Sequence, residues 1–498
     1  MNKHLRSILG LLLCLTMLTG CTAASVPLPT MTLPPISVGP EAPIGDAGLQ
    51  QEMIVPLYLP SQNRQSLLTF YDTLTISRDQ HPAEAILRAL LSHSGNSRVQ
   101  PLGGPVTLSL AGANPVEISG GVCTVNLSAS ALQLTSEDLY TAALAITATL
   151  CELPDVNHVN LLVAGTPVAM DVGGNLPLGC LTPQLGQELP VLWEQFSSRR
   201  TPVGTLPAAT PLTATAALYF PLADGSGIVA EPRRISFPGQ HPQQLVIALL
   251  EALSNGADVL DGTADMPHIA SLMLFAPEVT ELESGGRRVT LHLSADALRR
   301  ITAAGHDSAS LFAAINFTLT TFVPSLQQVI VLTGDQALTS LYSDALGSML
   351  FPGAVQTRQQ FVHALRGQTA LYLPGDGALI RKITALPYRS ARSPRALLMR
   401  LASPEIAALP ADLTDADILG LAIQDGTLLI HLSARYGDVI RASGQDQRLM
   451  AYSVVTTLGE LLNVRRVRFC FGGEAIENLG SDLCWSGEFL YQPGLIAH

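Results

Sequence analysis

Histidine recurs at one position of a strand that the chain contains three times, and imidazole is the side chain best suited to metal binding or proton transfer near neutral pH. The copies of this strand are Val122–Leu132, Arg288–Leu298 and Thr427–Tyr436. The residue directly before the shared Leu-Ser is Asn126, His292 or His431. Because strand side chains alternate between two faces, this position points away from the apolar side chains beside it. The sequence therefore predicts an exposed polar position that could serve as an interaction face, and a metal site is the weaker interpretation.

An acidic cluster precedes the third copy of the strand and consists of Asp412, Asp415 and Asp417. Calcium loops space such residues regularly and end in a glutamate, which is absent here, so we interpret the cluster as a solvated turn. The sequence also lacks a Walker A phosphate loop, a His-Glu-x-x-His zinc motif, a Gly-x-Ser-x-Gly nucleophile turn and a dinucleotide-binding glycine motif. We therefore predict no catalytic residue, no metal site and no cofactor, and we expect that the protein is not an enzyme.

Five cysteines follow the N-terminal region: Cys123, Cys151, Cys180, Cys470 and Cys484. No two of them form a Cys-x-x-Cys pair, so zinc and redox motifs are unsupported. Cys123 begins a strand and Cys151 ends the helix that runs back beside it, which could bring the two within reach of a disulfide. Cys470 and Cys484 are a second candidate pair. Export would permit disulfides, but buried thiols are equally compatible with the sequence.

The elements around these positions repeat as three copies of one pattern. Each copy opens on a Leu-Tyr-apolar-Pro strand, and these strands begin at Leu57, Leu218 and Leu371. A helix follows whose first residue is a proline, at His81-Pro82, His241-Pro242 and Ser393-Pro394. A hairpin comes next, and its second arm is the repeated strand.

A second helix then returns the chain to one more apolar strand in each copy. The expected N-caps of this helix are Ser136, Asp307 and Ser443. Because the helix links two strands of one sheet, these strands are expected to be parallel. Each copy therefore predicts an α+β fold, in which two helices pack on one face of a small mixed sheet.

Length and composition agree with several globular domains. The chain has 498 residues, of which 47% are hydrophobic and 14% are charged. The predicted domains are 54–200, 216–345 and 369–491, joined by linkers at 201–215 and 346–368 as beads on a string with limited docking. The net charge of −12, without any basic segment, argues against nucleic acid and anionic lipid headgroups as partners.

The N-terminus has the features of an exported chain. Lys3 and Arg6 precede an apolar run from Ile8 to Leu18 that is too short to remain as a membrane helix, and Leu18-Thr19-Gly20-Cys21 follows. Residues 1–20 thus resemble a bacterial lipoprotein signal. The resemblance implies cleavage before Cys21, lipidation of its sulfur and an extracytoplasmic location on the outer face of the cell membrane. Residues 21–53 are expected to form a Pro-rich tether.

The repeated motifs resemble the GerMN domain of the GerM lipoproteins of spore-forming bacteria. The resemblance rests on Leu57-Tyr58-Leu59-Pro60, His81-Pro82 and Leu127-Ser128 and on their equivalents in the other copies, and it covers most of the chain after the tether as three tandem domains. It implies a compact α+β domain similar to the ring-building motifs of secretion and sporulation channels. It also implies a role in sporulation and spore germination through protein contacts, without catalytic residues.

These features together predict a membrane-anchored, non-catalytic lipoprotein that acts as a scaffold or protein–protein interaction module. The expected partners are other envelope or sporulation proteins, or further copies of the chain, together with the membrane through lipidated Cys21. An alternative is a lipoprotein that binds a cell-wall fragment or a small solute between its domains. That alternative predicts a cleft lined by Tyr, Trp and polar groups, but only Trp193 and Trp485 occur, and neither lies in the repeated core. A cell-wall hydrolase would need a convergent acid/base or metal cluster, which the sequence does not supply.

Overall fold

A computed structural model gives the structure of the chain and describes residues 42–77, 81–171, 173–199, 211–260, 262–283 and 285–497. The expected signal peptide 1–20, Cys21 and the tether as far as residue 41 lie outside the described residues, as does most of the linker 201–215. Among the helices that are described, none has both the length and the apolar character needed to cross a bilayer.

The first repeat contains a two-stranded ribbon, two helices and a four-stranded sheet. The ribbon is formed by β2 (Gln50–Pro60) and β3 (Leu67–Ser77), and the helices are α2 (Ala83–Ser92) and α3 (Ser136–Leu150). The sheet has the order β4 (Val116–Ser119), β5 (Val122–Leu127), β6 (His158–Val163) and β7 (Thr166–Pro167). A short helix, α4 (Leu189–Ser197), follows.

The second repeat has the same order of elements with a longer C-terminal extension. Its ribbon is β8 (Leu212–Pro221) with β9 (Ile228–Phe237), and its helices are α5 (Pro242–Ser254), α6 (Ala297–Ala303) and α7 (Ser308–Phe322). Its sheet contains β10 (Glu278–Glu281), β11 (Arg287–Leu293), β12 (Leu326–Thr333), β13 (Gln336–Ala337) and β16 (Val355–Gln356). Between β13 and β16 lies the hairpin of β14 (Ser340–Ser343) and β15 (Gly347–Leu350), and the short helix η5 (Arg358–Ala364) follows β16.

The third repeat repeats this arrangement. Its ribbon is β17 (Arg366–Pro374) with β18 (Leu379–Pro387), and its helices are α8 (Pro394–Leu401), α9 (Ala434–Ala442) and α10 (Gln447–Leu462). Its sheet has the order β1 (Gly45–Gly48), β19 (Ile418–Gln424), β20 (Thr427–Leu432), β21 (Arg466–Phe471) and β22 (Phe489–Leu490). The first strand of this sheet therefore comes from the N-terminal end of the described chain.

The expected parallel crossover is present in every repeat. β5 pairs in parallel with β6, as β11 does with β12 and β20 with β21. In the first repeat, for example, Val125 lies opposite Leu161. The strand before β5, β11 or β20, which is β4, β10 or β19 respectively, pairs with it in antiparallel orientation. The predicted hairpin and crossover are thus confirmed.

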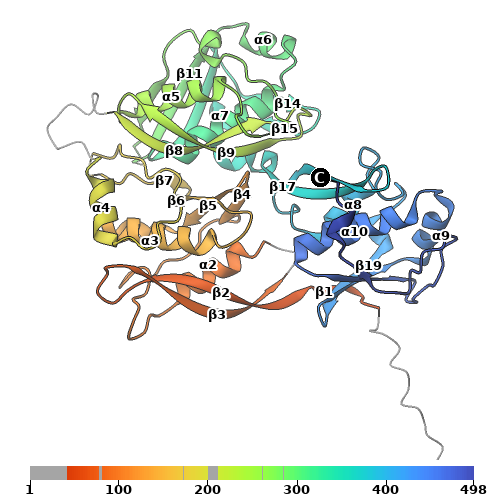
Figure 1. Cartoon of the computed structure of the whole chain (residues 1–498). Helices are drawn as coiled ribbons and strands as arrows, with labels where there is room; N and C mark the ends of the chain where they lie inside the picture. Colours follow the sequence, from red (N-terminus) through yellow and green to blue (C-terminus); the bar gives the residue numbers. More distant parts are fainter. Residues whose placement is uncertain are drawn as a thin grey trace, which may run out of the picture. The chain divides into compact units, whose positions relative to one another are not determined.

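The second helix of each repeat is buried along most of its length. Every residue of α3 from Leu139 to Leu150 is buried, and so is every residue of α7 from Ala309 to Phe322. Figure 1 shows the reason in the first repeat, where α3 lies between the ribbon β2–β3 and the sheet that contains β5 and β6. The α+β class is confirmed, with one difference from the expected arrangement: the opening strand of each repeat lies outside the main sheet and covers the other side of the helices. A helix enclosed on both sides is apolar all round, as α3 is.

The helix starts follow local capping chemistry. His241 and Ser393 are N-caps before a proline, and their side chains accept hydrogen bonds from the backbone N–H groups of Gln243 and Ala396. Of the three expected caps of the second helix, Asp307 is confirmed. The other two predictions, Ser136 and Ser443, are wrong, because the capping side chains belong to Thr135 and Asp446.

The first two repeats share one hydrophobic core. Buried apolar side chains from Val55 in β2 to Leu365 after η5 form a single cluster. A second cluster fills the third repeat and includes Leu49 from the N-terminal segment. The expectation of separate beads with limited docking is therefore wrong for the first two repeats. Hydrophobic periodicity identifies which residues are buried but not which repeat covers them.

Two segments that were expected to be connecting chain are folded. Residues 45–53, assigned to the tether, form β1 and the start of β2. In the expected linker 346–368, β16 pairs with β12, and the side chains of Phe351 and Phe361 are buried against one another with ring centroids 5.4 Å apart. This segment therefore completes the second repeat.

Candidate functional site

One polar contact is the same in all three repeats and joins the ribbon to the buried helix. The backbone N–H of Tyr58 donates to Thr149 Oγ1, that of Tyr219 to Thr318 Oγ1 and that of Tyr372 to Thr457 Oγ1, each at 3.0 Å. A buried N–H without a partner is costly, and each threonine supplies the acceptor for one such N–H. Sequence reasoning missed these residues. The signal is a Thr-Leu dipeptide at one turn of each helix, at residues 149, 318 and 457.

The tyrosine hydroxyls show how the second repeat diverges from the other two. Tyr58 donates to Glu152 at 2.6 Å and Tyr372 to Glu460 at 2.5 Å, whereas the residue at the equivalent position of α7 is Thr321. Burial and the glutamate partner raise the pKa of Tyr58 and raise that of Tyr372 to about 12. Both phenols therefore stay protonated at neutral pH and act as hydrogen-bond donors.

We expect Thr318→Val to destabilise the chain by about 1–3 kcal/mol, because it leaves the N–H of Tyr219 buried without an acceptor at nearly unchanged volume. Chemical denaturation measures the change. Thr213→Val, at an exposed position of the same strand β8, is the matched control and is expected to stay within about 0.5 kcal/mol. Equal effects of the two variants would show that the buried contact is not needed.

The turn between β4 and β5 is a meeting point of the three repeats. The Ser119 hydroxyl donates to the carbonyl of Arg366 at 2.6 Å and accepts from the backbone N–H of Ala230 at 3.0 Å. Ser119 belongs to the first repeat, Ala230 to β9 of the second and Arg366 to β17 of the third. Gly120 follows, and a Cβ placed there would lie 1.6 Å from the carbonyl oxygen of Ala230. Only glycine permits this approach.

A buried ion pair lies beside this turn. Arg358, in η5, pairs with Glu117 of β4, and their side chains are 11% and 10% exposed. The guanidinium also donates to Thr321 Oγ1 and lies 4.0 Å from the ring centroid of Phe317, both in α7. Although burial opposes the charged form, Glu117 raises the pKa of Arg358, so the guanidinium stays charged. The pair therefore ties the sheet of the first repeat to the buried helix of the second.

Arg287 makes a second polar connection between the first two repeats. It lies in β11 with its side chain 9% exposed, and its guanidinium donates to the carbonyl of Gly174 at 2.8 Å and to Asn175 Oδ1 at 3.2 Å. It also donates to the carbonyl of Pro324 at 3.2 Å and to Glu281 at 2.8 Å. Its donors hold the loop after β7 against the second repeat.

A histidine–aspartate pair lies where the first repeat meets the third. His81 Nε2 is 2.8 Å from Asp155 Oδ2, and Arg392 donates to the same oxygen at 3.4 Å. Such a pair could orient a general base, but His81 Nδ1 already accepts the N–H of Ala83 at the start of α2. Burial lowers the pKa of His81, which is neutral at pH 7. With both ring nitrogens engaged, His81 is a capping and joining residue.

At acidic pH, the free energy of unfolding should depend on the protonation of Asp155. Burial alone would raise its pKa, but the hydrogen bond from His81 and the charge of Arg392 lower it from 3.8 to about 2. The folded protein thus binds this proton less tightly than the unfolded chain, so the contribution is present above about pH 4 and is lost as the pH falls towards about 2.

We expect the stability difference between the wild type and Asp155→Asn to shrink by about 1 kcal/mol across that window, a value reduced for the partial exposure of the carboxylate. Urea denaturation at a series of pH values measures it. Asp376→Asn, in an exposed turn, is the control. A difference that does not vary with pH would contradict the assignment.

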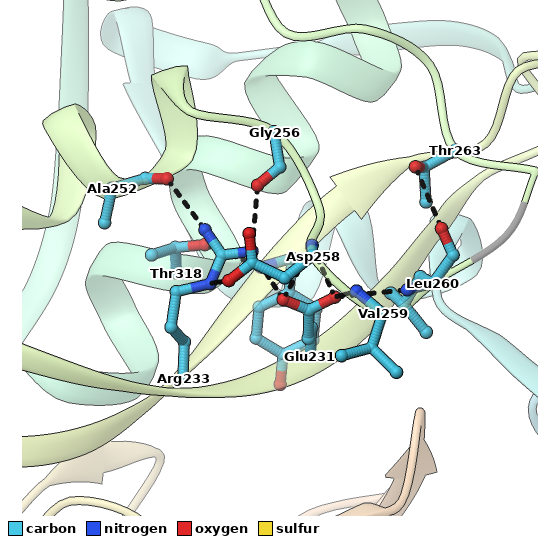
Figure 2. Close-up of polar contacts among 10 residues, drawn as sticks. Glu231, Arg233, Ala252, Gly256, Asp258, Val259, Leu260, Thr263 and Thr318 are labelled. Atoms are coloured by element: carbon cyan, nitrogen blue, oxygen red, sulfur yellow. Dashed lines mark hydrogen bonds and ion pairs between the residues drawn. The ribbon is translucent and has the colours of Figure 1, made fainter.

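The second repeat contains a further buried carboxylate, which Figure 2 shows in detail. Glu231 accepts backbone N–H groups from Asp258, Val259 and Leu260 at 3.0–3.3 Å and pairs with Arg233. Arg233 also donates to the carbonyls of Ala252 and Gly256. Burial raises the pKa of Glu231, but the hydrogen bonds from these donors outweigh burial, so the net pKa is lowered. The carboxylate is therefore ionised and has no proton to transfer. The cluster holds the loop after α5 against β9.

The three residues of the predicted interaction face, Asn126, His292 and His431, lie in different surroundings. Asn126 is half-buried and bonds locally, donating to the carbonyl of Ala111 at 3.1 Å and accepting from the N–H of Gly165 at 2.8 Å. His292 is partly exposed beside the ring of Phe275, with centroids 5.8 Å apart. His431 is only 6% exposed, so the prediction that it lies on an open face is wrong. The N-terminal segment covers it, which strand alternation alone cannot reveal.

The acidic cluster before β19 is also different from its prediction. Asp417 is buried rather than solvated, and it accepts hydrogen bonds from Arg435, Ser433 and Thr414. Arg435 is the main reason that the pKa of Asp417 lies well below its usual range. Asp415 stays at the surface, where its side chain is 76% exposed. Asp417 therefore caps a turn and pairs with Arg435.

The five cysteines of the folded region are free thiols, so neither candidate disulfide, Cys123 with Cys151 or Cys470 with Cys484, is formed in the structure. Burial raises the pKa of Cys151 to about 11 and that of Cys180 to about 12. Cys123 and Cys470 are buried and also shifted upwards. Because the thiolate is the reactive form, these four are inert packing residues. Cys484 is exposed, and a hydrogen bond with Ser486 lowers its pKa.

The described residues contain no group of three or more His, Cys, Asp or Glu side chains that could hold a metal ion. A cleft of about 510 Å³ lies beside α2 and is lined by Ser77, His81 and Arg88 of the first repeat and by Tyr388 and Arg389 after β18. Arg389 donates from the edge of this cleft to the carbonyl of Ala113 at 2.9 Å. The buried charged side chains Glu117, Arg287 and Arg358 join repeats, and Glu231 with Arg233 anchors a loop.

A family model and several solved structures are similar to parts of this chain. The model of the Germane family, described as sporulation and spore germination, matches residues 56–169. The tandem GerMN domains of the sporulation protein GerM from Bacillus subtilis are 19% identical with a TM-score of 0.21, over 58% of this chain and 96% of that chain. The first GerMN domain of that protein is 22% identical with a TM-score of 0.20, over 27% of this chain and 96% of that chain. No curated protein matches the chain.

The matched residues coincide with the repeat unit defined by the structure. Residues 56–169 run from the second half of β2 to just past β7, and they contain β3, both helices and the sheet of the first repeat. Elements of the same order and the same tyrosine–threonine contact follow in the second and third repeats. The first repeat of the chain is thus similar to the Germane family, whose model is described as sporulation and spore germination.

Proposed function

We propose that the protein is a non-catalytic assembly module of the cell envelope, anchored to the outer face of the membrane through lipidated Cys21 and used in sporulation or spore germination. Its role is to hold three domains in fixed contact and to present their outer surfaces to other envelope or sporulation proteins. The match of residues 56–169 to the Germane family, described as sporulation and spore germination, supports the process. The leader that precedes Cys21 supports the anchor.

The observation that carries the proposal is how the buried charged groups are used. Glu117 with Arg358, and Arg287, connect separate repeats, while Glu231 with Arg233 fixes a loop. Catalytic groups usually have an unengaged atom that faces a cavity and a pKa adjusted to proton transfer. These groups are paired with opposite charges or with backbone groups of neighbouring segments. A structure built in this way is suited to holding surfaces in place.

The surfaces available to partners are apolar at several points. Phe275 is 67% exposed, Leu274 is 52% exposed and Ile54, on the outer face of the first ribbon, is 70% exposed. Exposed aromatic and aliphatic side chains of this size are common in protein interfaces. They support protein contacts as the mode of action.

Complementation of a deletion strain tests the proposal. The wild-type gene should restore sporulation or germination, whereas Cys21→Ser should leave the folded protein unanchored in the soluble fraction and restore it poorly. Ser25→Ala, four residues further along, is the control and should behave as the wild type. Full function of an unanchored Cys21→Ser protein would refute the anchor, and normal sporulation in the deletion strain would refute the role.

The alternative function, capture of a cell-wall fragment or small solute between domains, has one favourable observation. The cleft of about 510 Å³ is large enough for a small ligand and combines Tyr388 with the cationic side chains Arg88 and Arg389. Titration of the full chain with soluble muropeptides tests it by calorimetry. Saturable binding that Tyr388→Ala and Arg389→Ala remove would favour this function over the assembly role.

A further inference from the structure

Without β1, strand β19 would be the outer strand of the third-repeat sheet, and it differs from its counterparts in the other repeats. Its sequence, Ile418–Gln424, carries no charged residue, whereas β10 has a glutamate at each end. The corresponding strand of the first repeat, β4, contacts β9 and β17. An apolar, uncharged edge strand pairs readily with other chains unless something covers it. In this structure the cover is β1, from the N-terminal segment.

β1 adds to this edge in a close parallel pairing. Gly45 lies opposite Gly420, and Gly48 lies opposite Ala422. A Cβ at Gly48 would lie 2.4 Å from the Cβ of Ala422, and a Cβ at Gly420 would lie 2.3 Å from the carbonyl oxygen of Pro43. The sequence of β1, Gly-Asp-Ala-Gly, has the composition of a turn and a low strand propensity. The segment is extended because it pairs with the otherwise unpaired edge of β19.

Three side-chain contacts select the segment Pro43–Leu49. Arg395 donates from Nε and Nη2 to the two carboxylate oxygens of Asp46, each at 2.8 Å. Leu49 is fully buried in the core of the third repeat. His431 Nδ1 is 2.8 Å from the carbonyl of Pro43, so this nitrogen carries the proton and donates. Main-chain pairing with one charged and one apolar anchor is the usual form of peptide recognition by strand addition.

The arginine is specific to the third repeat. The residue after the proline at the start of the first helix is Arg395 in the third repeat, Gln243 in the second and Ala83 in the first. Gln243 is occupied by its own repeat, since it donates to the carbonyl of Pro277 at 2.8 Å. The site for an Asp-x-x-Leu segment is therefore present at the third repeat alone among the three described.

We propose that this edge also takes the Pro43–Leu49 segment of a second copy of the chain, so that copies associate by exchanging their N-terminal strands. The contacts that recognise the segment lie within seven residues and do not depend on which chain supplies them. The segment Pro43–Leu49 runs directly into β2, which begins at Gln50, and so short a connection favours exchange. Exchange re-forms the same contacts, so its cost is low. A second copy is the occupant whose sequence is already known to bind.

Two complementary variants of the full chain test the exchange. Asp46→Arg removes the charged anchor of the strand but leaves its acceptor edge intact, and Arg395→Asp does the reverse. Each variant alone should sediment as a monomer. An equimolar mixture contains one intact strand and one intact edge, so it should form a heterodimer at least about 100-fold more tightly than either variant self-associates. A mixture that sediments as monomer overturns the proposal.

A control and a second measurement guard against misfolding. The doubly substituted chain Asp46→Arg/Arg395→Asp restores the charge pair and should match the wild type in hydrogen exchange of β19 and in sedimentation. A fluorescent peptide of residues 42–51 should bind the Asp46→Arg chain, and the same peptide carrying arginine at position 46 should bind at least about 10-fold less tightly. Peptide binding without a heterodimer would mean that the edge takes strands from other proteins, and this outcome also overturns exchange between copies.

Discussion

Arg358→Met is expected to lower the free energy of unfolding by about 3–5 kcal/mol, because it leaves the Glu117 carboxylate buried without its partner. The substitution also removes the guanidinium from the ring of Phe317 and from Thr321. Guanidinium-chloride denaturation, followed by circular dichroism, measures the change. Because the pair connects the first repeat to the second, we also expect the transition to become less cooperative.

A double substitution separates the ion pair from the packing around it. Glu117→Met/Arg358→Met removes both charges and should cost less than Arg358→Met alone, since no unpaired charge is left in the interior. Arg88→Met breaks the exposed pair of Arg88 with Glu84 on α2 and should cost about 0.5 kcal/mol or less. If Arg358→Met were as mild as Arg88→Met, the pair would not be holding the repeats together.

Gly120→Ala has the second large expected effect, a loss of about 3 kcal/mol or more. The added Cβ would lie 1.6 Å from the carbonyl oxygen of Ala230, so the turn between β4 and β5 must move away from β9. The shift also breaks the hydrogen bonds of Ser119 to the second and third repeats. Thermal and chemical unfolding of the variant measure the loss.

Gly104→Ala is the matched control for that substitution. Gly104 has φ of +56°, close to the +55° of Gly120, but its Cβ would meet no atom within 4 Å. The loss of stability in Gly104→Ala therefore measures only the backbone strain of an alanine in the left-handed region, which is about 1 kcal/mol. Equal losses from the two substitutions would show that the contact with Ala230 does not matter.

Local structure could be predicted from the sequence because its signals are short. Alternating residues fixed the hairpin arms β5, β11 and β20, and proline after histidine or serine marked the start of the first helix. The parallel crossover followed from connectivity alone. The expected absence of a catalytic centre remains a prediction, which the use of the charged side chains supports.

The contacts between repeats could not be predicted in the same way. Glu117 and Arg358 are 241 residues apart in the sequence. Taken separately, each would be predicted to be an ordinary charged residue on the surface. Asp46 and Arg395 are 349 residues apart, and the segment around Asp46 has the composition of a tether. His431 was expected at an exposed position because alternation describes one strand, whereas its burial depends on a segment from the other end of the chain.

The proposed function requires this protein to contact other proteins at the membrane. Photocrosslinking in sporulating cells tests it directly, with a photoreactive amino acid in place of Phe275 or Ile54, both exposed, and in place of the exposed polar Asp376 as control. The account predicts crosslinks to a defined envelope protein from the first two positions, lost in Cys21→Ser cells. The absence of crosslinks from both positions in anchored, folded protein would contradict it.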